Sequence, residues 1–185
     1  MYYELMSTKT LLTADELERM PDDDSVQLEL DEGELITMPP AGGEHGYREG
    51  EIHSVLRSFV RKNKLGRVYT GDTGFRLSDD IVRSPDVAFV RRDRVPAVHS
   101  SGFCKGAPDF AIEIRSPHES FRQLMRKIKQ YLAAGTHTVW VFDSDRREVD
   151  VFEASGAERT LTARQVLKAP ELLPGFSIRV SELFE

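Results

Sequence analysis

Hydrophobic and polar residues alternate over 109–115, and this pattern predicts a β-strand. The apolar residues on one face of this strand are Phe110, Ile112 and Ile114. The opposite face carries Glu113 and Arg115, residue types that are seldom buried unless they are paired or bind something. The strand is therefore a candidate for chemistry as well as for packing.

The same kind of pattern predicts the rest of a core. Further strands are expected over 67–70, 74–77, 86–90, 138–143 and 148–153. Apolar residues at helical spacing predict two long helices, over about 44–64 and 119–134, which Gly66 and Gly135 are expected to end. The second helix is long enough for a right-handed crossover between parallel strands, so the sheet is expected to be mixed.

Both ends of the chain predict shorter elements. Thr13 and Glu16 have the spacing of a capping box, which begins a short helix. Two short strands, 26–30 and 34–38, flank Asp31-Glu32-Gly33 and predict a β-hairpin. The tail, 172–184, is expected to add an edge strand and a final turn. We therefore expect one domain, 1–185, with an N-terminal extension (1–43), an α/β core (44–143) and C-terminal strands (144–185).

Composition narrows the class of protein. The net charge of −6 argues against a protein that coats nucleic acid, but it allows an enzyme with a local basic groove. A single cysteine, Cys104, and the lack of any apolar run of membrane-spanning length fit a cytoplasmic protein. Five cations near the end of the first long helix are expected to be solvated surface rather than a binding patch. They are Arg57, Arg61, Lys62, Lys64 and Arg67.

Two acids are candidates for a metal site. Asp86 and Glu113 lie on strands that a mixed sheet can place side by side, and converging carboxylates are ligands for hard cations such as Mg²⁺. The residues alone leave an alternative open, in which Asp86 only begins a strand and Glu113 pairs with Arg115. Asp109 shares the face of Glu113 but lies about 13 Å away along the strand, too far for the same metal.

Seven motifs follow one another along nearly the whole chain. They are 27–35 (QLELDEGEL), 71–77 (GDTGFRL), Pro85-Asp86, 113–117 (EIRSP), Lys127 with 131–135 (YLAAG), 139–143 (VWVFD) and 173–177 (LPGFS). In this order they resemble the Uma-two family of restriction-endonuclease-like proteins, which belongs to the PD-(D/E)XK nuclease superfamily. The resemblance implies a restriction-endonuclease-like α/β fold, with a mixed central β-sheet flanked by helices and the N-terminal β-hairpin as an extension.

The resemblance also implies roles for individual residues. Asp86 and Glu113 would be the metal-binding acids, with Mg²⁺ or Mn²⁺ as the ion. A glutamate of the early hairpin, which lands on Glu29, would join them, although the hairpin pattern alone reads Glu29 as a polar-face residue.

The superfamily's lysine, two residues after the second acid, is replaced here by Arg115. An arginine stays protonated, so it can clamp a phosphate but cannot take a proton from water. In the family pattern the lysine lies in the next helix, at Lys127. Periodicity alone leaves Lys127 and Lys129 open, since they sit on opposite shoulders of the apolar face, and a solvated Lys127 is the alternative.

The expected function is that of a Mg²⁺-dependent endonuclease that hydrolyses DNA phosphodiester bonds. A homodimer is expected, because duplex cleavage requires two scissions related by a two-fold axis. Two alternatives stay open: a regulatory or nucleic-acid-binding module that keeps the fold without turnover, and a metal-dependent hydrolase of RNA or nucleotides. Glu44 and His45, at a helix start, could line the site but are expected to be solvated, and Trp140 is expected to lie in the core.

Overall fold

The computed structural model describes residues 10–21, 26–116 and 119–185. Its central sheet has six strands in the order β11-β10-β9-β8-β6-β3. These strands are β3 (Gly66–Thr70), β6 (Val87–Arg91), β8 (Phe110–Ile114), β9 (Thr138–Asp143), β10 (Glu148–Glu153) and β11 (Glu158–Thr162). The strands β8 and β9 are parallel and every other neighbouring pair is antiparallel, so the sheet is mixed, as predicted.

A second sheet has the order β2-β1-β5-β4-β7. Its strands are β1 (Gln27–Asp31), β2 (Glu34–Met38), β4 (Phe75–Arg76), β5 (Val82–Arg83) and β7 (Cys104–Lys105). The predicted hairpin forms β1 and β2, and its turn places Glu32 and Gly33 at positive φ angles of 51° and 81°. The capping box at Thr13 is also present and begins α1 (Ala14–Glu18).

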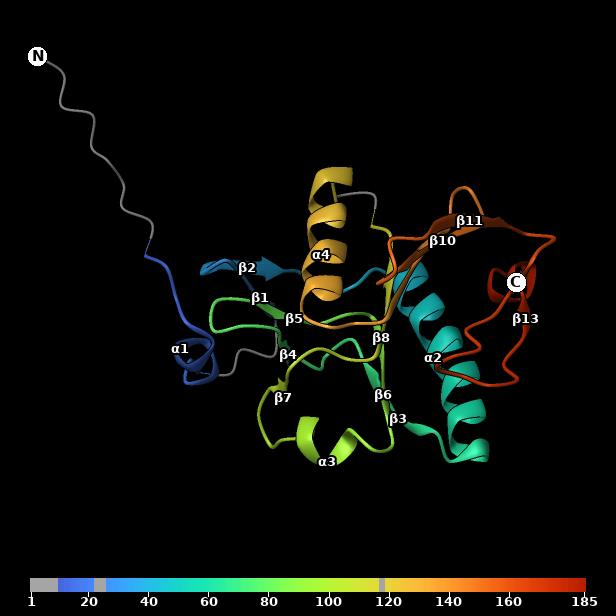
Figure 1. Ribbon diagram of the computed structural model, residues 1–185. Helices are drawn as coiled ribbons and strands as arrows, with labels where there is room; N and C mark the ends of the chain where they lie inside the picture. The colour runs from blue at the N-terminus through green and yellow to red at the C-terminus, as the bar shows by residue number, and fades with distance from the viewer. Residues whose placement is uncertain (1–9, 22–25, 117–118) are drawn as a thin grey trace, which may run out of the picture.

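Helices cover both faces of the central sheet (Figure 1). They are α2 (Gly43–Asn63), α3 (Val95–Val98), α4 (Phe121–Ala133) and a 3-10 turn, η1 (Val180–Leu183). The helix α4 connects the parallel strands β8 and β9, which is the predicted crossover. In the part of the chain that is described, no helix is both long and apolar enough to cross a membrane.

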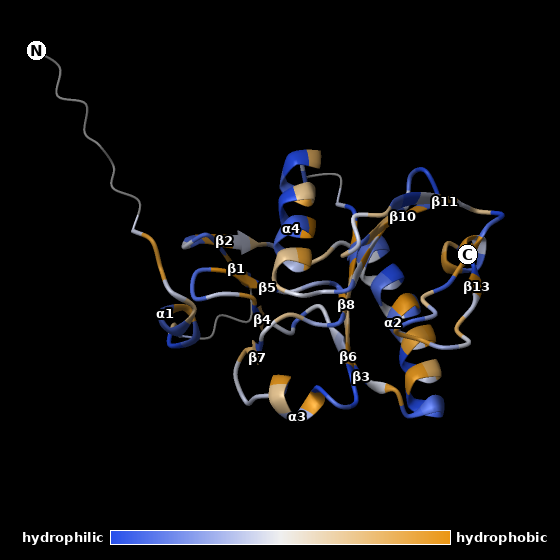
Figure 2. Ribbon diagram, viewed as in Figure 1, coloured by the Kyte–Doolittle hydropathy of each residue, from blue (hydrophilic) through white to orange (hydrophobic). Residues whose placement is uncertain are grey.

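The alternation of β8 divides the core in two. Phe110, Ile112 and Ile114 pack with α2 and the C-terminal segment, whereas Ala111 packs under α4. Hydrophobic residues follow the central strands in Figure 2, and the two helices present mixed faces around them. Trp140 is 1% exposed and lies in the larger cluster, as predicted. The face of β8 that carries Glu113 is therefore the face that α4 covers.

The end of α2 and the C-terminal tail differ in part from the sequence predictions. The long helix α2 ends at Lys64, which takes the left-handed conformation with a φ of 55°, and Gly66 instead begins β3. A Cβ on Gly66 would lie 2.0 Å from the carbonyl oxygen of Val90, so the glycine is required by the neighbouring strand. The tail forms the predicted final turn, η1, but its short strand joins no edge of the central sheet. It forms a separate pair, β12 (Val166–Leu167) with β13 (Ile178–Arg179), and packs on the α2 side.

Candidate functional site

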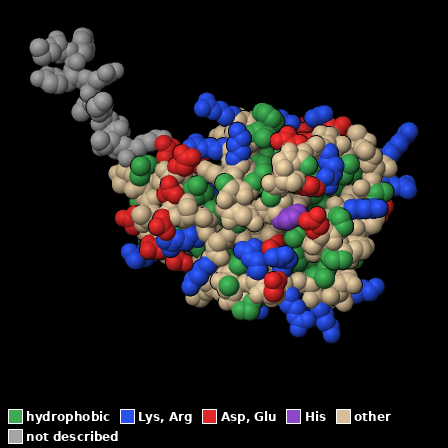
Figure 3. All heavy atoms as spheres, viewed as in Figure 1, with side chains coloured by type: hydrophobic (Ala, Val, Ile, Leu, Met, Phe, Trp, Pro, Cys, Tyr) green, Lys and Arg blue, Asp and Glu red, His purple; other side chains and the backbone are tan. Residues whose placement is uncertain are grey.

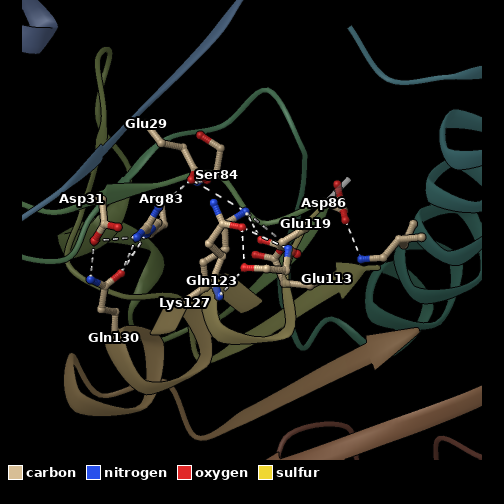
Figure 4. Close-up of polar contacts among 12 residues, drawn as sticks. Glu29, Asp31, Arg83, Ser84, Asp86, Glu113, Glu119, Gln123, Lys127 and Gln130 are labelled. Carbon is tan, nitrogen blue, oxygen red and sulfur yellow. Dashed lines mark hydrogen bonds and ion pairs between the residues drawn. The ribbon is translucent and has the colours of Figure 1, made fainter. Parts of the chain in front are cut away.

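The two predicted acids face each other across neighbouring strands. Pairs such as Val87 with Ile112 and Ala88 with Ala111 fix the register of β6 and β8. One step further along this register, Asp86 lies opposite Glu113. The carboxylate of Asp86 accepts a hydrogen bond from the backbone N–H of Ile114, with 2.6 Å between nitrogen and oxygen (Figure 4). The antiparallel pairing thus brings together two residues that the sequence separates.

Glu113 is buried on the α4 side of the sheet. Its Oε1 accepts a hydrogen bond from the Tyr131 hydroxyl at 2.7 Å, and its Oε2 lies 3.7 Å from the ammonium nitrogen of Lys127. Burial raises the pKa of Glu113 to about 8, because the nearby positive charge of Lys127 only partly offsets the loss of water. This carboxyl group is therefore protonated more easily than that of an exposed glutamate.

Lys127 projects from α4 into a group of acids. Its nitrogen lies 3.7 Å from Glu29 Oε2 and 3.5 Å from Glu119 Oε1, and 14% of the side chain is exposed. Burial lowers the pKa of Lys127, but the surrounding carboxylates, with Glu113 first, outweigh it and hold the pKa above its ordinary value. Lys127 is thus a fixed positive charge, whereas the alternative candidate, Lys129, is exposed.

Glu29 forms the far wall of this group. It is fully buried, accepts a hydrogen bond from the Ser84 N–H at 2.9 Å and pairs with Arg83 Nη1 at 2.8 Å. Arg83 is itself buried, and its remaining donors bind Asp31 at 2.9 Å and the side-chain oxygen of Gln130. The interpretation of Glu29 as a solvent-facing residue of the hairpin is wrong, because α4 covers that face and Arg83 of the adjacent strand β5 pairs with the carboxylate.

Arg115 does not pair with Glu113. Its guanidinium binds Asp143 Oδ2 at 2.7 Å, at the end of β9, and 41% of the side chain is exposed. The alternative in which Glu113 is neutralised by Arg115 is therefore excluded. Asp109, at the other end of β8, pairs with Arg91 and Arg94 at 3.1 and 3.0 Å, away from the acids of the site.

The start of α2 contributes two residues to the site. His45 Nε2 lies 2.9 Å from Asp86 Oδ1, so the expectation of a solvated His45 was wrong. Glu49, which the sequence reading missed, accepts a hydrogen bond from the Gly71 N–H at 3.1 Å. Glu44 does face solvent, where it pairs with Arg48.

A signal for these two residues was present in the sequence. His45 and Glu49 are one helical turn apart and continue the line of the buried residues Ile52 and Leu56, so they point toward the sheet.

The donor atoms of the site fit a divalent cation. One ligand atom each from His45, Glu49 and Asp86 lie within 4.8 Å of one another. Negative charge accumulates here: burial and then Asp86 act to raise the pKa of Glu49, although its hydrogen bond from Gly71 opposes them. The Asp86 carboxylate likewise raises the pKa of Glu113. A divalent cation would relieve this repulsion, and the two carboxylates and the imidazole offer it oxygen and nitrogen ligands.

The mixed sheet, with acids on adjacent strands and helices on both faces, defines a restriction-endonuclease-like fold. Residues 14–181 match the model of the Uma2 (Uma-two) family, which is described as "Putative restriction endonuclease". The chain therefore belongs to the Uma2 family.

One similar solved structure is that of a "putative nuclease belonging to DUF820" from Anabaena variabilis, with a TM-score of 0.80 and 25% identity. The alignment covers 94% of this chain and 97% of that one. A comparison with curated proteins gave no match.

Proposed function

We propose that this protein is a divalent-metal-dependent endonuclease that hydrolyses phosphodiester bonds of DNA. The observation that carries the proposal is a pair of contacts on neighbouring strands: Asp86, just before β6, binds the backbone N–H of Ile114 in β8, and Glu113 of β8 lies 3.7 Å from Lys127 of α4. Two acids that repel each other, beside a lysine that stays charged, suit a cation and a phosphate better than they suit a packed core. Membership of the Uma2 family supports the same reaction class.

In this proposal Asp86 and Glu113 are the principal metal ligands, and His45 and Glu49 complete the set from α2. The ion is Mg²⁺ or Mn²⁺. When bound, it supplies positive charge that stabilises the transition state of phosphodiester hydrolysis and makes water more acidic. A bound cation would favour the carboxylate form of Glu113, because its positive charge would oppose the effect of burial on the pKa.

Lys127 acts as a charge rather than as a base. Because its pKa is held above the ordinary value, it cannot take a proton from water near neutral pH, but it can orient a water molecule or a phosphate oxygen. Glu29 positions the ammonium group from the far side, and Arg83 offsets the negative charge of Glu29. Arg115, more exposed and bound to Asp143, contributes a phosphate contact in this proposal.

The test compares two lysines of the same helix. Lys127→Ala should abolish Mg²⁺- or Mn²⁺-dependent cleavage of plasmid DNA, while Lys129→Ala should leave it largely intact. Arg115→Ala should weaken cleavage less completely than Lys127→Ala. Circular dichroism of each variant establishes that the fold is retained. A Lys127→Ala variant that cleaves like the parent would refute the assigned role of this lysine.

The metal assignment has a separate test. Calorimetric titration with Mn²⁺ should show a site in the parent that is lost in Glu113→Gln. Equal binding by the folded variant would exclude Glu113 as a ligand. Parallel assays on single-stranded DNA and on RNA show which nucleic acid is the substrate. A parent protein that binds Mn²⁺ and DNA but cleaves neither DNA nor RNA would be a binding module instead.

A further inference from the structure

A basic groove lies at the other end of the elements that form the site. It has a volume of about 510 Å³ and lies between the last turns of α2, the first residues of β3 and the segment from Arg92 to α3. Five of its lining residues are cations and none is an acid. They are Arg57, Arg61, Lys64, Arg67 and Arg92. Its floor is apolar, with Val60, Val68 and Pro96 among its residues.

The cations of the groove are open to solvent. All five are exposed, and no carboxylate in the described part of the chain forms an ion pair with any of them. In contrast, Arg91 and Arg94, which flank Arg92, are both engaged by Asp109. Lysine and arginine side chains project from the lower edge of the molecule in Figure 3, where Figure 1 places β3 and the end of α2. In a protein of net charge −6, a group of five cations with no acid among the residues that line the groove is a local exception.

Two elements lead from the groove to the candidate metal site. The edge strand β3 has Arg67 near its start, and Gly71, directly after its end, donates its N–H to Glu49 of the site. The helix α2 has His45 at the site and Arg57 at the groove. The separation is about 13 Å along the strand, at roughly 3.3 Å per residue, and about 18 Å along the helix, at about 1.5 Å per residue.

We propose that this groove binds the phosphate backbone of a DNA duplex whose scissile bond lies at the metal site. The inference rests on the proposed nuclease function and names the surface that holds its substrate. A separation of 13 to 18 Å corresponds to about four or five base pairs at roughly 3.4 Å each. Four of the five cations are arginines, whose planar guanidinium groups suit phosphate oxygens. The sequence analysis expected a solvated surface here; the cations are exposed, and the proposal gives that surface a ligand.

The binding test uses a fluorescein-labelled duplex of 20 base pairs in EDTA, so that no cleavage occurs. Arg57→Ala/Arg61→Ala should weaken binding by about tenfold or more at low salt, and should reduce the slope of log affinity against log salt by about 1.8, because each lost phosphate contact contributes about 0.9. The matched control is Arg164→Ala/Lys168→Ala, two exposed cations outside the groove that give the same change in net charge. The control should stay within about twofold of the parent.

The cleavage test separates this inference from the proposed function. With Mn²⁺, the groove variant should lose cleavage of the duplex but keep hydrolysis of the small diester bis(p-nitrophenyl) phosphate, which reaches only the metal site. Equal DNA binding by the groove variant and the control variant would refute the proposal that the groove binds DNA. Loss of binding to single-stranded RNA but not to the duplex would overturn the duplex as its ligand. If the parent hydrolyses neither compound, the nuclease proposal fails, and the binding test still shows whether the groove binds duplex DNA.

Discussion

Replacing Arg83 by methionine tests whether the buried ion network holds the candidate site together. The guanidinium group is 3% exposed and serves three acceptors: Glu29 at 2.8 Å, Asp31 at 2.9 Å and the Gln130 side chain. Methionine has a similar stem and no charge, so it leaves Glu29 buried without its closest cation. The variant is expected to fold less stably and to displace Lys127 toward Glu29.

The size of the effect follows from these contacts. Two carboxylates each lose a hydrogen bond to a charged group, and such a bond contributes about 1.5 to 3 kcal/mol, so the loss is about 3 to 6 kcal/mol. Breaking a buried ion pair by removing one partner typically costs about 3 to 5 kcal/mol, which agrees. Urea unfolding at pH 7 measures the loss as a lower midpoint at an unchanged slope.

A matched control uses the exposed arginine Arg76. Arg76 pairs with Asp15 and Asp79, but 30% of its side chain is exposed, and Arg76→Met should therefore cost about 1 kcal/mol or less. The double variant Glu29→Gln/Arg83→Met should be more stable than the sum of the two single losses predicts, because it removes both charges. A loss for Arg83→Met no larger than that for Arg76→Met would refute the reasoning.

Three other predictions concern pH, packing and assembly. The pKa of Glu113 is raised from 4.5 to about 8, so between these pH values the folded state binds a proton that the unfolded state has lost. The contribution of Glu113 to the free energy of unfolding should therefore fall as the pH rises from 4.5 to 8, by up to about 1.4 kcal/mol per pH unit. Urea midpoints at pH 5.5 and 7.5 should differ more for the parent than for Glu113→Gln, and Mn²⁺ should reduce the difference; equal differences would contradict the burial of a protonated acid. Gly66→Ala should destabilise the fold by about as much as the most damaging single substitutions, because the added Cβ would meet the carbonyl oxygen of Val90. Gly46→Ala, with open space around the added Cβ, should not, and thermal unfolding of the two variants measures the difference. Sedimentation should give a homodimer, and a 21.0 kDa monomer at working concentrations would contradict the two-fold arrangement.

The sequence alone determined the elements whose faces differ sharply in polarity. The strands 138–143 and 148–153 have the predicted limits, and the alternation in β8 separates the two sides of the core as expected. The capping box at Thr13 was also readable, because caps depend on residues only three positions apart. Local periodicity and local hydrogen bonds are properties of a short stretch, and a short stretch of sequence contains all the information they need.

Tertiary structure decided which of these residues meet. His45 and Asp86 are 41 residues apart, and Glu29 and Arg83 are 54 apart, so no local pattern could pair them. Lys127 and Lys129 are equivalent by periodicity. Of the two, Lys127 lies among three carboxylates, because its side of α4 faces β1 and β8, whereas Lys129 is exposed. The left-handed end of α2 at Lys64 and the requirement for Gly66 also depend on the position of β6. Ion pairs and close backbone contacts form between segments that are far apart in the sequence, so they depend on how the whole sheet and its helices pack.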